Sequence, residues 1–126
     1  TYYIDGVQKM HVYFSNKNGY VDGVNIAKLD YDNTQGYGPE TVTMTFKADY
    51  VIDNGYFNYS VHKFSSNGTL SESNAIVRLY SGNTLIDTYN VPTTGNGNVW
   101  NVFKITKDGV KKINSFTNTS SSSTIQ

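Results

Sequence analysis

Residues 41–47 read TVTMTFK, and their side chains alternate strictly between polar and apolar. In an extended chain Val42, Met44 and Phe46 lie on one side and the threonines on the other. Because successive side chains of a strand point to opposite faces, a period of two residues is typical of a strand with one buried face. The segment therefore predicts a half-buried β-strand.

Similar runs lie on both sides of this segment, and turn-forming residues separate them. Their alternation and their β-branched and aromatic content indicate strands, whereas no window of helical length has an apolar period of about 3.6 residues. The further predicted strands cover residues 10–14, 57–61, 75–80, 84–91, 99–106 and 110–113.

Two connections between these runs predict tight hairpins. Ser-Gly-Asn at residues 81–83 separates one pair of runs, and Asp108-Gly109 separates another. An Asp-Gly pair tolerates the positive φ angles of a type I′ turn. About eight short strands joined by such turns predict an all-β fold, and we expect an antiparallel β-sandwich rather than a barrel.

The chain has 126 residues, enough for one domain with a core of ordinary size. We expect a single β-sandwich domain over residues 1–116. Residues 117–126 are rich in Ser and Thr and offer little apolar surface to bury, which predicts a flexible tail or linker. A linker between modules and a frayed terminus are both compatible with this composition.

Charge and composition exclude several classes of function. Ten basic residues balance ten acidic ones, which argues against a nucleic-acid partner or an anionic membrane surface. No apolar run approaches the roughly 18 residues that span a bilayer, so no membrane insertion is expected. Cysteine is absent, which excludes disulfides, thiolate metal sites and a Cys nucleophile. Eleven tyrosines among many Asn, Ser, Thr and Gly residues are typical of extracellular all-β modules.

The segment 29–40, LDYDNTQGYGPE, combines carboxylates with turn-forming residues. Asp30 and Asp32 are two residues apart, so in an extended chain both carboxylates leave from one side. Asn33 and Glu40 could add oxygens if the chain folds back. Ca²⁺ takes about six to eight oxygen ligands of these kinds, so the four residues form a candidate calcium site. The alternative is that the polar side chains cap a turn through bonds to backbone N–H groups.

Tyrosine side chains offer a candidate carbohydrate site. Exposed aromatic rings stack on pyranose rings, and Tyr31 and Tyr37 lie within segment 29–40, while Tyr13, Tyr20 and Tyr56 lie outside it. The alternative is that these rings are buried and only their hydroxyl groups reach the surface. The single tryptophan, Trp100, is expected in the core.

Catalytic motifs are missing from the sequence. It contains no GxSxG elbow, no Gly-rich phosphate loop and no zincin helix, so we expect no enzymatic activity. His11 and His62 could meet across neighbouring strands as transition-metal ligands. Without a ligand spacing such as HxxxH, the simpler interpretation is that each is a surface residue with one hydrogen bond.

Segment 29–40 resembles the LDxDDTxGYGPE signature of the YfaP-like family of bacterial β-sandwich domains. Residues 11–17, HVYFSNK, resemble the HVYYSNK of multi-domain surface members, and YSVH at 59–62 matches theirs. YNVP at 89–92, followed by VWNVF at 99–103, is similar to their FNVP and VWNVFE. The resemblance covers most of residues 10–114 and implies an extracytoplasmic, non-catalytic β-sandwich domain.

The chain departs from this family in two ways. Asn33 replaces the last aspartate of the family's DxDD, which removes one negative charge from a cation site. The DLDSHL strand that usually precedes the domain has no counterpart before Tyr2. A sandwich that lacks an edge strand exposes unpaired backbone groups, so we expect the chain to accept a strand from a partner or from its own excised segment.

Two functions are compatible with these features. The first is a non-catalytic binding or adhesion module of a bacterial surface or secreted protein, stabilised by Ca²⁺, that recognises a glycan or a protein. The second is a structural spacer or assembly unit that completes its sheet with a partner β-strand. Both place the chain outside the cell or on the cell surface.

Overall fold

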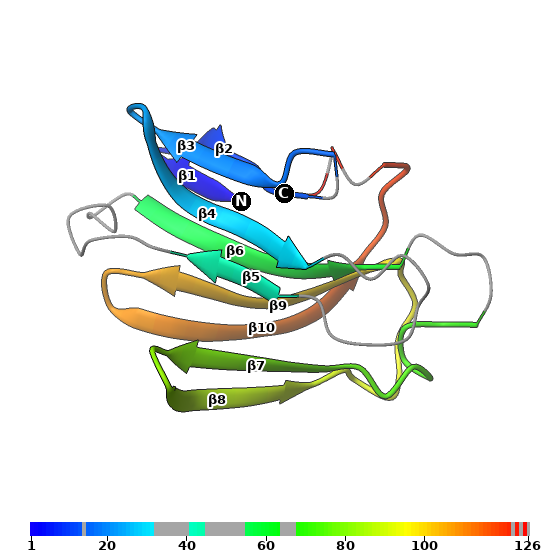
Figure 1. Cartoon of the computed structure of the whole chain (residues 1–126). Coiled ribbons are helices and arrows are strands. Elements are labelled where there is room, and N and C mark those ends of the chain that lie inside the picture. The colour runs from blue at the N-terminus through cyan, green and yellow to red at the C-terminus, as the bar shows by residue number, and fades with distance from the viewer. Residues whose placement is uncertain are drawn as a thin grey trace. The chain divides into compact units, whose positions relative to one another are not determined.

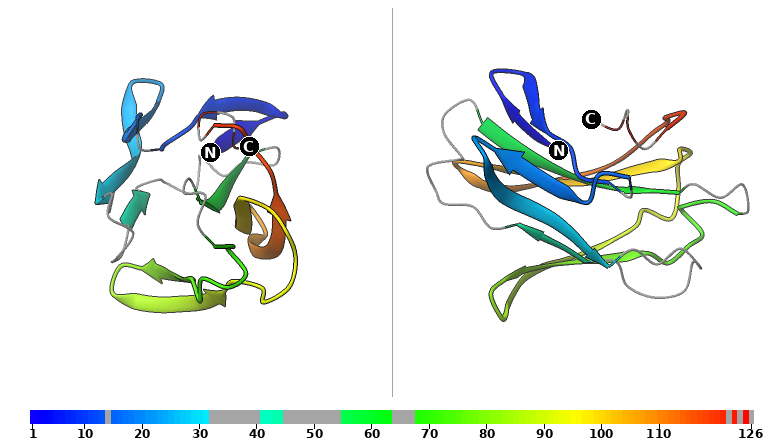
Figure 2. Two further views of the ribbon diagram at one scale, coloured as in Figure 1. Left: turned by 90° about the vertical axis from the view of Figure 1, so that its right-hand side faces the viewer. Right: turned by 45° about the horizontal axis from the view of Figure 1, so that its top comes forward.

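A computed structural model describes residues 1–13, 15–31, 41–44, 55–63, 68–121, 123 and 125 (Figures 1 and 2). These residues form ten β-strands and no α-helix, and each strand pair with a defined register is antiparallel. The predicted all-β, antiparallel class is therefore confirmed.

The strands pair in three sheets of the described chain. The orders are β10-β9-β6-β1-β2, β3-β4-β5 and β7-β8. The strands are β1 (Tyr2–Ile4), β2 (Val7–Met10), β3 (Asn18–Val21), β4 (Val24–Tyr31), β5 (Thr41–Met44), β6 (Gly55–His62), β7 (Ile76–Ser81), β8 (Thr84–Asn90), β9 (Val99–Thr106) and β10 (Gly109–Thr117).

The chain divides into two compact units. The first comprises residues 1–57 and 105–109, and the second comprises residues 58–104 and 110–125. Strand β6 contributes its first residues to one unit and its remaining residues to the other. The predicted boundary at residue 116 stays a prediction.

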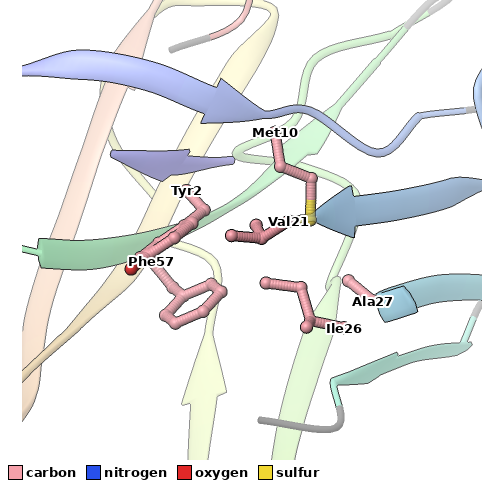
Figure 3. Close-up of a cluster of buried hydrophobic side chains, with 6 residues drawn as sticks. All are labelled: Tyr2, Met10, Val21, Ile26, Ala27 and Phe57. Carbon is pink, nitrogen blue, oxygen red and sulfur yellow. The ribbon is translucent and has the colours of Figure 1, made fainter. Parts of the chain in front are cut away.

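The first unit has a core built from two sheets. Tyr2 of β1 stacks on Phe57 of β6 with ring centroids 4.4 Å apart, and the same cluster contains Val21 and Ile26 from the β3-β4-β5 sheet. Figure 3 shows these side chains directed toward one another, together with Met10 and Ala27. Because both sheets contribute to one apolar cluster, this unit has the face-to-face packing of a β-sandwich.

Two Asp-Gly pairs make the tight turns of the first unit. Asp5 and Gly6, between β1 and β2, have φ angles of 51° and 75°. Asp22 and Gly23, between β3 and β4, have φ angles of 51° and 77°. Positive φ at both central residues is the geometry of a type I′ turn, which matches the twist of the strands it joins.

The second unit has its own buried aromatic residues. Phe103 of β9 lies 5.2 Å from Tyr59 of β6 and 5.2 Å from Tyr89 of β8, measured between ring centroids. Trp100 is fully buried, which confirms its predicted place in the core, and its indole Nε1–H donates to Asn114 Oδ1 over 2.8 Å. The indole N–H is therefore satisfied, as burial of a polar group requires.

The predicted strand over residues 10–14 is wrong in its extent. Strand β2 ends at Met10, and Tyr13 and Asn16 exchange backbone hydrogen bonds of 3.1 and 2.9 Å that close a turn. The Asn16 side-chain amide also donates to the His11 carbonyl over 2.6 Å. Local turn bonds of this kind compete with strand pairing. Phe14 and the predicted strand residues 45–47 lie outside the described residues.

Both predicted hairpins are present, but one turn differs in type. Ser81 pairs with Thr84 around Gly82, as expected. At the other hairpin only Gly109 has a positive φ, 114°, so the predicted type I′ turn is wrong. The Asp108 N–H donates to Thr106 Oγ1 over 3.2 Å, which gives the turn a side-chain bond in place of that geometry.

Candidate functional site

The β3-β4-β5 sheet of the first unit carries the start of the predicted cation and carbohydrate segment. Leu29 of β4 pairs with Val42 of β5, and Tyr31 pairs with Thr41. Strand β4 therefore has one residue more than β5 over this step, and that residue is Asp30. This is a β-bulge, a device that redirects side chains and is common beside binding sites.

The structure describes only part of the predicted site. The backbones of Asp30 and Tyr31 lie in β4. The remaining predicted residues are outside the described part of the chain: Asp32, Asn33, Tyr37 and Glu40. Within the described ranges no group of three His, Asp or Glu residues could hold a metal ion. The Ca²⁺ site therefore stays a prediction.

A second irregularity in β4 shapes the solvent face of the same sheet. Tyr20 pairs with Asn25, but Gly19 pairs with Ala27, so Ile26 is the extra residue of β4. Both Ile26 and Ala27 are buried in the core cluster. The bulge turns two consecutive side chains inward and leaves Asn25 and Lys28 on the outside.

Four exposed side chains then lie on one face of the β3–β4 hairpin: Asn18, Tyr20, Asn25 and Lys28. The exposed fraction of Tyr20 is 56%. The Asn25 Nδ2 donates to Asn18 Oδ1 over 3.2 Å, and Asn18 is the Cα partner of Lys28. The Tyr20 ring and the hydrogen-bonded amides of Asn18 and Asn25 are thus exposed to solvent side by side. We call these three residues the hairpin face.

Close packing beneath the hairpin face orients it. A Cβ atom at Gly19 would lie 2.8 Å from Val12 Cγ2 and would also collide with the Met10 side chain. Strand β3 therefore lies directly against Met10 and Val12, with Gly19 and Val21 inward and the hairpin face outward. Next to the hairpin, the Leu29 N–H donates to the Lys17 carbonyl over 2.8 Å.

The other described tyrosines of the predicted carbohydrate platform are less accessible. Tyr13 is half-buried and stacks on His11 with ring centroids 4.8 Å apart. Tyr56 is half-buried and stacks on Tyr3 at 5.0 Å. Tyr20 is the one member of the predicted set whose described side chain is exposed.

The histidines belong to different units. His11, in the first unit, has its Nδ1 atom 3.0 Å from Thr1 Oγ1. His62, in the second unit, is half-buried, and desolvation lowers the pKa of its imidazole below its usual value of 6.5. Burial disfavours the charged form of a histidine, which accounts for the direction of this shift.

A polar row crosses β6, β9 and β10 in the second unit. Ser60 Oγ donates to Asn101 Oδ1 over 3.1 Å, and Asn101 Nδ2 donates to Thr117 Oγ1 over 3.1 Å. These groups bond to one another between adjacent strands and so stabilise the sheet. We therefore regard this row as structural.

Sequence reasoning missed Asn18 and Asn25 of the hairpin face. The available signal was Asp22-Gly23, flanked by Tyr20-Val21 and Val24-Asn25. An Asp-Gly pair between apolar residues predicts a two-residue hairpin, and that hairpin sets Tyr20 opposite Asn25.

In the part of the chain that the structure describes, no helix has the length and hydrophobicity to cross a membrane. No protein-family model, curated protein or solved structure matches this chain. The resemblance to the YfaP-like family therefore rests on the quoted motifs and stays a prediction.

Proposed function

We propose that this chain is a non-catalytic binding module of an extracellular or cell-surface protein. It recognises a glycan or a protein through the β3-β4-β5 sheet and segment 32–40, which joins β4 to β5. The observation that carries the proposal is the bulge at Asp30. It lies where the acidic, tyrosine-containing segment begins, and the Tyr31–Thr41 pair anchors both ends of that segment in the sheet. Chain segments whose ends are fixed in a sheet are common places for binding residues.

Calcium has a supporting role in this proposal. Carboxylates held close together repel, and a bound Ca²⁺ ion would neutralise that repulsion. A ligand that binds only the folded state raises the melting temperature by an amount that follows RT ln(1 + [L]/Kd). We expect a Ca²⁺-specific rise over EDTA and Mg²⁺ that is lost in Asp30→Asn. Asp22→Asn is the matched control, because Asn tolerates the positive φ of that turn.

Binding itself is tested on an array of immobilised glycans with and without Ca²⁺. We expect retention by the unaltered chain and loss in Tyr31→Ala. Tyr80→Ala removes an exposed ring from the other unit and should bind normally. If Tyr31→Ala is retained on the glycans as strongly as the unaltered chain, the segment that begins at Tyr31 is not part of the binding site.

A second candidate function is assembly through strand addition. Within the described chain β7 and β8 pair only with each other. Strand β8 contains neither Lys nor Pro, two residues that commonly protect a sheet edge; its protective features are Asp87 and a bulge at Ile86. Four large side chains of this hairpin are about half exposed: Ile76 (47%), Tyr80 (53%), Leu85 (50%) and Ile86 (53%). Such an edge is suited to accept a further strand.

Sedimentation velocity over a range of protein concentrations tests this second candidate. Association that increases with concentration and disappears in Ile86→Lys would support it, because a lysine on an edge strand opposes pairing. Ile113→Lys on β10 is the control, since Ile113 is also exposed and β10 already carries Lys111 and Lys112. A monomer at all concentrations would count against self-assembly.

A further inference from the structure

We propose that the hairpin face of Asn18, Tyr20 and Asn25 binds a pyranose ring of a neutral glycan. This inference rests on the proposed binding function and assigns it a ligand class and a site outside segment 29–40. The Tyr20 ring stacks on the apolar face of the sugar. The two amides bond its hydroxyl groups.

The first argument is the exposure of Tyr20. Among the tyrosines whose side chains the structure describes, Tyr20 and Tyr80 are exposed by more than half, at 56% and 53%. Tyr80 lies beside the apolar side chain of Leu85, its Cα partner. Tyr20 instead lies opposite the amide of Asn25. The electron-rich face of an aromatic ring attracts the slightly positive C–H groups of a pyranose, and a neighbouring amide suits the hydroxyls at the rim of that sugar.

The second argument is the hydrogen-bonding capacity of the two amides. Their mutual bond uses one N–H of Asn25 and one lone pair of the Asn18 oxygen. An amide side chain has two N–H donors and a carbonyl acceptor, so the pair retains both donors of Asn18 and both a donor and the acceptor of Asn25. A sugar hydroxyl donates and accepts at once. Neighbouring hydroxyl groups on one ring can therefore bond to this pair of amides.

The third argument is that the site is held in place before a ligand arrives. The type I′ turn at Asp22-Gly23 fixes the hairpin, and Val21 and Ile26 anchor its inner side in the core. The close contact at Gly19 holds β3 in position. A ring and amides on a rigid hairpin lose little conformational entropy on binding, which favours recognition of a small polar ligand.

The groups that define the site are uncharged, which selects a neutral sugar. Lys28 lies opposite Asn18 and adds a donor at the margin. Recognition by the ring and the amides should change little with ionic strength, whereas recognition by Lys28 alone would weaken as salt screens its charge.

Isothermal titration of the full chain with soluble neutral oligosaccharides tests the proposal. The probes are tetrasaccharides of β-linked glucose, of mannose and of N-acetylglucosamine. We expect at least one probe to bind, with affinity about tenfold or more weaker in Tyr20→Ala and clearly weaker in Asn25→Ala. Tyr20→Phe should retain most of the affinity because it keeps the ring. Tyr80→Ala is the matched control for the loss of an exposed tyrosine.

The outcomes separate this site from the proposed function. Equal affinity in Tyr20→Ala with loss in Tyr31→Ala would overturn the hairpin site and leave the binding function at segment 29–40. If none of the oligosaccharides binds, the hairpin site is also overturned. The melting temperatures with Ca²⁺ and the glycan array would still test the proposed binding function. Affinity that collapses between about 0.05 and about 0.5 M salt would indicate anion binding at Lys28 and would overturn the neutral-sugar assignment. Melting temperatures of the variants verify that each one folds.

Discussion

Gly19 of β3 pairs with Ala27 of β4 and not with Ile26. A two-residue hairpin around Asp22-Gly23 would in regular pairing set Gly19 opposite Ile26. In the observed register Ile26 is the extra residue of a bulge, and Ala27, which regular pairing would set opposite the exposed Asn18, is buried next to it. One irregular step thus adds Ala27 to the core of the first unit and leaves Lys28 facing solvent.

Ile26 should therefore contribute strongly to stability. It has an exposed fraction of 0% and belongs to the core cluster, so Ile26→Ala leaves a cavity between the two sheets. We expect a loss of about 2–5 kcal/mol in the free energy of unfolding, measured by urea denaturation. Val24→Ala on the same strand is the control, because Val24 is 51% exposed. A small effect at Ile26 would contradict its burial in the core cluster.

Substitution of Asn114 should lower the stability of the fold for two separable reasons. Asn114 has a positive φ of 55° within β10, and its Oδ1 accepts the indole N–H of Trp100. Asn114→Ala loses both the tolerated backbone geometry and the acceptor, so we expect a cost of about 1–3 kcal/mol in chemical denaturation. Asn114→Gly relieves the backbone but still leaves the indole without its partner. Asn114→Asp keeps an acceptor and should be the mildest change; equal losses in all three would disprove this ranking.

Much of the strand pattern was predictable where strands are long and regular. Strand β9 coincides with the predicted run 99–106, and the hairpin at Gly82 was expected from its sequence. Strands β1 and β3 have three and four residues, too few for a period to emerge. The run 10–14 alternates well, yet the Tyr13–Asn16 turn ends the pairing. Local turn chemistry prevailed over periodicity there.

The candidate site was predictable only in part. The sequence identifies Tyr20 as one of several candidate stacking residues, but it cannot rank their exposure, because a tyrosine suits both a core and a surface. The exposure of Tyr20 depends on the strand register and on the close packing at Gly19. The bulges at Ile26 and Asp30 follow from pairing with neighbouring strands, so no local pattern in β4 reveals them.

His62 should make stability depend on pH below neutrality. Desolvation lowers its pKa in the folded state below 6.5, so the folded chain takes up this proton at lower pH than the unfolded chain. Between the two pKa values the unfolded state binds more protons, and the free energy of unfolding falls as the pH drops. The stabilisation is present above pH 6.5 and is lost as the pH falls through the lowered value.

Urea denaturation at several pH values between about 7.5 and about 5 measures this dependence. His62→Gln should flatten the profile in that window. His11→Gln is the control and should leave the contribution of His62 in place. A profile that is unchanged in His62→Gln would assign the pH dependence to other groups.

Asn98 should hold the segment that follows β10. Its Nδ2 donates to the Thr119 carbonyl over 2.7 Å, and its Oδ1 accepts the Thr119 N–H over 2.8 Å. Gly97 lies so close to the chain at this point that an added Cβ would be 2.6 Å from the Thr117 carbonyl oxygen. Residues 117–119 therefore make specific contacts with the connection before β9, although their composition predicted a flexible tail.

Asn98→Ala removes both bonds, each worth about 0.5–1.5 kcal/mol. We expect faster hydrogen exchange at the Thr119 amide and a modest loss of stability. Asn96→Ala is the neighbouring control, since Asn96 is exposed. Gly97→Ala should cost about 1–3 kcal/mol, because its new methyl group meets a backbone carbonyl that cannot move as a flexible side chain can. If hydrogen exchange at the Thr119 amide is unchanged in Asn98→Ala, other contacts hold the segment. The predicted end of the domain at residue 116 would then have to be tested by a different experiment.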